Sequence, residues 1–169
     1  MNLFEAIQKR HSYRGDYLDQ PVPREDLKKI VQAGIQAPSG CNAQSTSFII
    51  VDDTEVINRI RELVRLPAPA VIACVVDPTP VYKDMSFELE DCAAAVENML
   101  LCITALGYAT VWLDGVLRGP IGPQIETILG VPEGKRVQIL LPIGVPTEEV
   151  PQREKKPFEE RAWFNRYGG

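Results

Sequence analysis

The sequence is short of the side chains on which most enzymes rely, and its 169 residues include a single histidine, His11. A hydrolytic triad would need His11 as its base, and no Gly-x-Ser-x-Gly motif offers a nucleophile. Metal sites lack both the histidines and the carboxylate spacing. The phosphate-binding motifs Gly-x-x-x-x-Gly-Lys-Ser/Thr and, after a strand, Gly-x-Gly-x-x-Gly are also missing. If the chain is an enzyme, a bound cofactor therefore carries the difficult chemical step.

Cysteine, basic charge and long apolar runs are also scarce. The net charge of −5 disfavours wholesale binding to nucleic acid. No apolar run approaches the ~20 residues that span a bilayer, and the N-terminus lacks the cleavage site of a signal peptide, so we expect no membrane association. Cys41, Cys74, Cys92 and Cys102 form no close metal-ligand pair. We expect buried thiols at the last three and a reducing, cytoplasmic location.

What the sequence does contain is typical of one globular domain with a sizeable core, since 45% of its residues are hydrophobic and 24% are charged. Hydrophobic periodicity predicts a long helix over 83–106, and the apolar run 70–76 predicts a fully buried strand. Pro142 argues for an edge position or a bulge in the last strand. The predicted helices are 2–10, 23–37, 83–106 and 120–129, together with one that is capped by Thr54 and ends before Pro67. The predicted strands are 48–51, 70–76, 110–113 and 137–145.

Residues 146–169 differ from the rest, because they are rich in proline and charge and end in Trp163, Phe164 and Tyr167. Such aromatic residues would be exposed to solvent unless the segment lies on another surface. We expect residues 1–145 to form the core and 146–169 to form an arm of the same domain, with a partner subunit as its natural contact.

The segment Arg10–Arg14 is a candidate anion site. In an extended chain Arg10, Ser12 and Arg14 project to one face, and on a helix the two arginines are neighbours. Either geometry suits a phosphate, which two guanidinium groups and a hydroxyl can bind. The alternative is that these arginines only complement the dipole of a first helix.

Three other stretches are candidates for ligand binding. The loop 37–44 carries two primary amides that suit the edge of a heterocycle, although it also fits an ordinary polar loop. Glycines at both ends of 107–115 would let the backbone approach a flat ligand. The basic run 153–157 can close over a phosphate or simply be solvated.

Five motifs in this order resemble the FMN-dependent nitroreductase family, over nearly the whole chain. They are Arg-His-Ser-Tyr-Arg at 10–14, Ala-Pro-Ser-Gly-x-Asn-x-Gln at 37–44, Gly-x-x-Thr-x-Trp at 107–112, Pro-Ile-Gly at 142–144 and Lys-Lys-Pro-Phe-Glu-Glu at 155–160.

The resemblance implies an α+β, nitroreductase-like fold, in which a central mixed β-sheet is flanked by helices around a long central helix. It also implies a homodimer with two FMN molecules at the interface and an extended C-terminal arm swapped onto the partner subunit. The implied activity is ping-pong hydride transfer from NAD(P)H to a small acceptor such as a nitroaromatic, a quinone or a flavin. Alternatives on the same fold are reductive dehalogenation, dehydrogenation, and flavin binding without turnover.

The resemblance also assigns roles to residues, with no catalytic side chain and no metal. Arg10, Ser12 and Arg14 would hold the FMN phosphate and ribityl end, helped by Arg153 or Lys155. The loop around Ser39 would border the flavin across the dimer interface, and the backbone N–H groups near Asp114 would face the flavin N5 and O4. The expected FMN-binding residues are Arg10, His11, Ser12, Arg14, Pro38, Ser39, Asn42, Leu113, Asp114, Gly115, Arg153 and Lys155.

The chain departs from the family pattern in three places. Ser45-Thr46 stands where many relatives have Pro-Trp, and Ala109 stands where they often have a second glycine. Residues 65–88 leave little room for the helical excursion that covers the flavin in larger relatives. We therefore expect a more open pocket with looser substrate selection.

Overall fold

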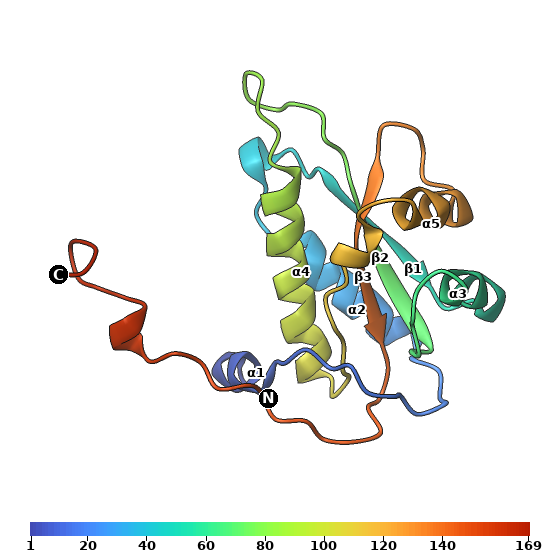
Figure 1. Cartoon of the computed structure of the whole chain (residues 1–169), viewed down its shortest axis with the longest axis horizontal. Coiled ribbons are helices and arrows are strands. Elements are labelled where there is room, and N and C mark those ends of the chain that lie inside the picture. Colours follow the sequence, from blue (N-terminus) through green and yellow to red (C-terminus); the bar gives the residue numbers. More distant parts are fainter.

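A computed structural model describes residues 1–169 and contains a three-stranded antiparallel sheet in the order β1-β2-β3 (Figure 1). The strands are β1 (Thr46–Val51), β2 (Ala70–Val76) and β3 (Arg136–Ile143). All seven residues of β2 are buried, because it is the central strand and has helices on both faces. The continuous apolar run at 70–76 is thus confirmed as a fully buried strand.

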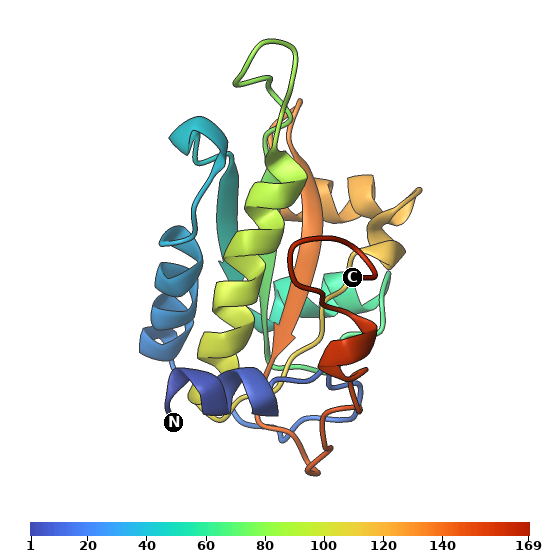
Figure 2. The ribbon, with the colours of Figure 1, turned by 90° about the vertical axis from the view of Figure 1, so that its left-hand side faces the viewer.

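Helices form a layer on each side of the sheet (Figures 1 and 2). α2 (Arg24–Ile35) and α4 (Glu88–Ala105) pack on the face of β2 that carries Ile72 and Cys74. α3 (Thr54–Arg61) and α5 (Ile121–Leu129) pack on the face that carries Val71. The alternation of side chains along β2 therefore supplies two separate cores.

The strand directions correct the expectation of a mixed sheet. Within this chain every neighbouring pair of strands is antiparallel. After β1 the chain passes through α3 and starts β2 at the end of the sheet where β1 stopped. Hydrophobic patterns identify strands but not their directions, which is why the sequence did not reveal this arrangement.

The predicted strand 110–113 is also corrected. It makes only two isolated bridges to β3, Ala109 with Gly144 and Leu113 with Leu140. In this register Val111 faces Pro142, whose missing N–H removes the hydrogen bond that would complete the ladder between the two bridges. The expected edge position of Pro142 is confirmed, since β3 is an edge strand of the sheet.

Two helix starts differ from the prediction. α4 begins at Glu88 and not at 83, because Tyr82 and Met85 form a tight turn with Lys83 at a positive φ of 52°. The cap of α3 is Asp53 and not Thr54. The Asp53 carboxylate accepts hydrogen bonds from the backbone N–H groups of Glu55 and Val56, at 2.9 and 3.0 Å.

The two ends of the chain leave apolar side chains uncovered. α1 (Leu3–Lys9) lies near the C-terminal end of α4, yet its apolar residues Leu3, Phe4 and Ile7 are 61%, 75% and 47% exposed. Residues 146–169 contain only the short helix η3 (Phe158–Glu160), and the last part of this segment, with η3, extends away from the body (Figure 1). No helix is both long enough and apolar enough to cross a membrane.

The cysteines are all free. Cys74 and Cys92 are buried as expected, whereas Cys102 is half-buried and Cys41 is exposed.

Candidate functional site

Two segments from opposite ends of the sequence run side by side along one edge of the molecule. The N–H of Leu18 donates to the carbonyl of Val145 at 2.8 Å, and Tyr17 forms a β-bridge with Pro146. Further along, the Gln152 side chain donates to the carbonyl of Arg10. The base of the arm is thereby fixed against the Arg10–Arg14 segment.

The Arg10–Arg14 segment is extended, which settles the geometry that the sequence left open. α1 ends at Lys9, and Arg10 has extended backbone angles. Tyr13 is 1% exposed, and its N–H donates to the carbonyl of Thr110 at 2.8 Å. Because neighbouring side chains in an extended chain point to opposite sides, burial of Tyr13 turns Ser12 and Arg14 outward.

These outward side chains line a cavity of about 520 Å³ between the two segments. Arg10 and Arg14 line it from the N-terminal segment, and Arg153 and Lys155 line it from the arm. Glu148 is the one acidic residue in its wall, so the charge of the lining is strongly positive, and we call this space the cationic cavity. Guanidinium forks, an ammonium and the Ser12 hydroxyl form a donor set that fits a phosphate.

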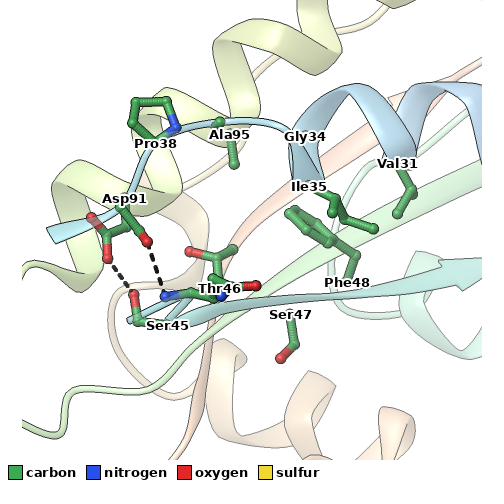
Figure 3. Close-up of a pocket in the computed structure, with 13 residues that line it drawn as sticks. Val31, Gly34, Ile35, Pro38, Ser45, Thr46, Ser47, Phe48, Asp91 and Ala95 are labelled. Atoms are coloured by element: carbon green, nitrogen blue, oxygen red, sulfur yellow. Dashed lines mark hydrogen bonds between the residues drawn. The ribbon is translucent and has the colours of Figure 1, made fainter. Parts of the chain in front are cut away.

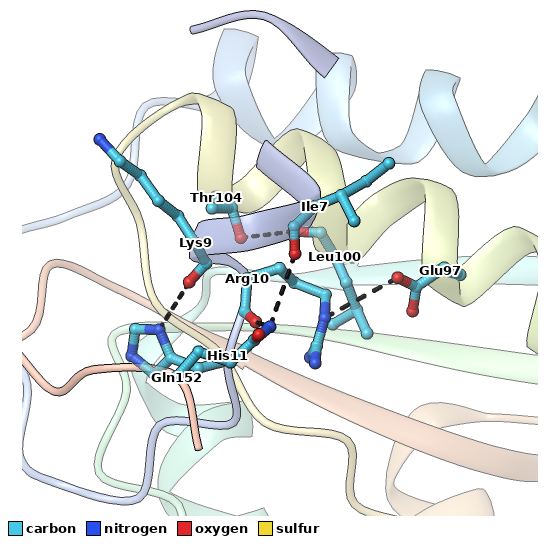
Figure 4. A network of polar contacts seen from close by, with 8 residues as sticks. All are labelled: Ile7, Lys9, Arg10, His11, Glu97, Leu100, Thr104 and Gln152. Carbon is cyan, nitrogen blue, oxygen red and sulfur yellow. Dashed lines mark hydrogen bonds and ion pairs between the residues drawn. The ribbon is translucent and has the colours of Figure 1, made fainter. Parts of the chain in front are cut away.

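Figure 4 shows how the side chain of Arg10 and its neighbours are held. The Arg10 Nε lies 3.8 Å from a carboxylate oxygen of Glu97 on α4, and the Arg10 side chain is 21% exposed. His11 also lines the cavity, and its Nδ1 donates to the carbonyl of Lys9 at 2.9 Å. These contacts orient Arg10 and His11 before any ligand binds.

The loop that contains Pro38, Ser39 and Asn42 lies beside the N-terminal end of α4 (Figure 1). Its short helix η1 (Gly40–Asn42) is attached to the first turn of α4, where Asp91 accepts a hydrogen bond from Gly40 N at 2.8 Å. Arg10, in contrast, contacts α4 at Glu97. Asp91 and Glu97 lie six residues apart on α4, ~9 Å along its axis. No residue of the loop 37–44 is among those that line the cationic cavity. Within one chain the structure does not bring this loop to the cationic cavity.

Pro38 and Ser39 line a second cavity, of about 330 Å³, between α2, β1 and α4 (Figure 3). Its wall is half apolar, with Val31, Ile35 and Phe48, and half polar, with hydroxyl groups and the Asp91 carboxylate. This cavity lies behind the loop, and the loop tip itself, Cys41–Gln44, is exposed.

The third predicted stretch, Leu113–Gly115, joins neither cavity. Leu113 exchanges two backbone hydrogen bonds with Leu140 of β3, at 3.1 and 2.9 Å. Asp114 pairs with Arg118 at 3.0 Å, and Gly115 begins the short helix η2 (Gly115–Leu117). Gly115 is exposed, and the space where a Cβ would lie is open. Its backbone is therefore accessible to a ligand or to a second chain.

Comparison with known proteins identifies the family. The Nitroreductase family profile matches residues 7–74 and 67–145, which together make up most of the chain. The chain belongs to the nitroreductase family. Two relatives are each named "Putative NADH dehydrogenase/NAD(P)H nitroreductase". The protein from Archaeoglobus fulgidus is 34% identical over 150 residues, covering 86% of each chain. The protein from Methanothermobacter thermautotrophicus is 31% identical over 163 residues, covering 91% of this chain and 82% of the relative.

A solved structure shows that the nitroreductase fold extends over the whole chain. The FMN-dependent nitroreductase from Clostridium difficile R20291 superimposes with a TM-score of 0.83 and covers 97% of this chain and 99% of its own. Its sequence is 24% identical, so it supports the fold.

Several residues that shape this candidate site were not predicted from the sequence. Tyr13 and Thr147 join the two cavity-forming segments, and Gln152 fixes the arm to Arg10. Tyr13 lies inside the Arg-His-Ser-Tyr-Arg motif and offered a signal, since an aromatic residue between outward polar ones indicates an inward anchor. Thr147 and Gln152 offered none, because their contacts join positions more than 130 residues apart.

Proposed function

We propose that this protein is an FMN-dependent oxidoreductase that transfers hydride from NAD(P)H to a small acceptor such as a nitroaromatic, a quinone or a flavin, by a ping-pong mechanism. Membership of the nitroreductase family supports the proposal, as do relatives named NAD(P)H nitroreductase and a solved relative named FMN-dependent.

The observation that carries the proposal is the cationic cavity. Four basic side chains from the two ends of the chain meet around about 520 Å³, beside the hydroxyl of Ser12. Surface cations are ordinarily dispersed, and gathering four of them around one concavity is unfavourable unless an anion neutralises them. A flavin mononucleotide phosphate is such an anion.

The chain's own residues would bind and orient the cofactor. Arg10, Ser12 and Arg14 would hold the phosphate, with Arg153 or Lys155 closing over it from the arm, while His11 forms part of the wall. Backbone N–H groups of Asp114 and Gly115 would donate hydrogen bonds to the flavin ring, while Leu113 forms part of the wall beside them. When bound, FMN supplies the hydride-transfer chemistry, which agrees with a sequence that lacks nucleophile, triad and metal site.

We also propose that the protein works as a homodimer whose site contains residues of both subunits. None of Pro38, Ser39 and Asn42 lines the cavity of its own chain, so they would reach the flavin of the partner subunit. The exposed apolar face of α1 gives such a dimer uncovered surface to bury. In this proposal residues 1–145 form the core and the arm, residues 146–169, lies on the partner.

The test is the visible absorption spectrum of the purified protein, followed by assays of NADH and NADPH oxidation. We expect a yellow protein whose flavin bands bleach when NADH or NADPH is added and return with a nitroaromatic or quinone. A colourless protein that takes up no FMN on titration would overturn the proposal.

The same assays separate the alternatives that use this cavity. Flavin binding without turnover would give the spectrum but no acceptor-dependent oxidation of NADH or NADPH. A halogenated phenol in the acceptor panel tests reductive dehalogenation, and flavin reduction by an organic substrate without NAD(P)H tests dehydrogenation. The cytoplasmic location inferred from the scattered cysteines stays a prediction.

A further inference from the structure

The loop 39–45 has a backbone that is unusual for its residues. Cys41, Asn42 and Gln44 have φ angles of 52°, 54° and 52°, in the left-handed region that side chains other than glycine disfavour. Three such residues within four positions persist only where the surroundings hold them. Hydrogen bonds within the loop hold part of this backbone, among them the one from Gln44 N to the Ser39 hydroxyl at 2.9 Å, and contacts from outside the loop hold its ends.

That support comes from the first turn of α4. The carboxylate of Asp91 accepts a hydrogen bond from Gly40 N at 2.8 Å with one oxygen. With its other oxygen it accepts a hydrogen bond from the Ser45 hydroxyl at 2.7 Å (Figure 3). One side chain thus holds both ends of the strained segment.

The position of Asp91 indicates that this contact is its role. Asp91 is 6% exposed, and none of the ion pairs in the structure involves it. A buried carboxylate without a cation is unfavourable unless hydrogen bonds satisfy it. The hydrogen-bond donors that it has are the two on this loop.

Two further contacts hold the same ends. The Cα of Gly40 packs against Phe87, so closely that an added Cβ would lie 2.4 Å from the Phe87 ring. The carbonyl of Ser45 accepts a hydrogen bond from Asp77 N at 3.0 Å. Between these fixed ends, residues 41–44 are exposed. The fold therefore presents the tip of the loop, with Asn42, as a supported protrusion.

We infer that Asp91 is a positioning residue for cofactor binding: by holding Gly40 and Ser45, it keeps the loop 39–45 in the conformation that borders the flavin. This inference rests on the proposed function. Asp91 touches neither the cationic cavity nor the exposed loop tip, so it acts through the loop.

The test compares FMN dissociation constants of the full-length wild type, Asp91→Ala, Asp91→Asn and Ser45→Ala, measured by flavin fluorescence at a temperature where all are folded. We expect about a tenfold weaker affinity for Asp91→Ala, since it loses two hydrogen bonds that support the loop. Asp91→Asn can still accept from Gly40 and pair with Ser45, so it should restore affinity to within about threefold. Ser45→Ala loses one contact and should lie between them, and it replaces Asp91→Ala if that variant does not fold.

Asn98→Ala is the matched control. Asn98 lies two turns further along α4 and donates to the carbonyl of Ala33 at 3.2 Å, so its loss removes a tertiary hydrogen bond of α4 without touching the loop. It should lower thermal stability and leave FMN affinity unchanged.

Three results would overturn the inference. They are wild-type affinity in Asp91→Ala, equal weakening in Asn98→Ala, and failure of Asp91→Asn to restore binding. If the wild type itself binds no FMN, the proposed function fails instead, and that result is recognisable before any variant is made.

Discussion

The hydroxyl of Tyr13 accepts a hydrogen bond from Thr147 N at 3.2 Å and donates one to the carbonyl of Asp16 at 2.6 Å. The contact between Tyr13 and Thr147 joins the Arg10–Arg14 segment to the base of the arm, and so it helps to hold the two walls of the cationic cavity together. A buried phenol thus adds to the contacts between two segments of the cavity wall, joining residues that are 134 positions apart.

Tyr13→Phe should therefore loosen the cavity. The ring remains buried, but its hydroxyl contacts are lost, which should lower the free energy of unfolding by about 1–2 kcal/mol. FMN affinity should fall several-fold, because one of the contacts that join the two walls is lost. Urea denaturation and FMN titration measure the two effects. Tyr82→Phe is the control, since Tyr82 is 49% exposed and should change stability by less than about 0.5 kcal/mol.

Arg10→Ala should weaken FMN binding and spare the reaction. A charge-assisted hydrogen bond contributes about 1.5–3 kcal/mol, so the dissociation constant should rise about tenfold or more. At saturating FMN the kcat should stay within about twofold, because the arginine anchors the cofactor and takes no part in the hydride step. Arg59→Ala, on the exposed side of α3, should change neither quantity. A large loss of kcat with flavin fully bound would show that Arg10 does more than anchor.

Asp52→Asn should reduce the sensitivity of the fold to acid. Arg24 donates two hydrogen bonds to this carboxylate, at 2.5 and 3.0 Å, which holds the pKa of Asp52 below its ordinary value of 3.8. A pKa that is lower in the folded than in the unfolded chain stabilises the fold above the unfolded value and stops doing so as the pH falls through the folded value. The wild type should therefore lose more stability than Asp52→Asn between neutral pH and about pH 2.5.

The effect of Asp52→Asn should be small, because the Arg24 side chain is 78% exposed and solvent screens the pair. Urea denaturation at both pH values measures it. Asp19→Asn, at an exposed carboxylate outside all ion pairs, should lose stability in parallel with the wild type. Identical acid sensitivity in Asp52→Asn and the wild type would refute the prediction.

The parts of the fold that sequence could predict are those that local patterns determine. The run 70–76 is apolar at every position, so it could only be a strand or helix covered on both faces. Gly130 ends α5 with a φ of 65°, as glycine at this place indicates. The direction of the strands depends on where the intervening chain runs, and no local pattern records that.

In the candidate site, too, some residues could be predicted from the sequence and others could not. Arg10 and Arg14 indicated an anion site, because charged residues can be identified directly in a sequence. The sequence did not identify the role of Asp91, since its partners Gly40 and Ser45 lie about 50 residues earlier. A contact at that range leaves no trace in one sequence. The sequence therefore predicted the basic groups that line the cavity, but not the residues that hold them or the loop in place.

The arm gives the sharpest test of the dimer, because its two roles occupy different residues. Arg153 and Lys155 line the cavity, whereas the aromatic residues follow from Phe158 onward. The Phe158 and Phe164 rings contact each other with centroids 6.1 Å apart, and Phe164 is 79% exposed. Within one chain this cluster has no other surface to cover it, so a partner subunit is what it would bind.

Two truncations separate these roles. Deleting 158–169 should abolish the dimer in sedimentation velocity while leaving Arg153 and Lys155 on the chain. Deleting 153–169 should abolish it as well and weaken FMN binding further, since the remaining cavity loses two of its four basic groups. The pairing of residues 145–152 with the N-terminal segment is kept in both, so a difference between them reports residues 153–157, which include Arg153 and Lys155. If the longer deletion sediments as a dimer with its full flavin content, the arm neither joins the subunits nor closes the phosphate site, and both parts of the proposal for the arm are wrong.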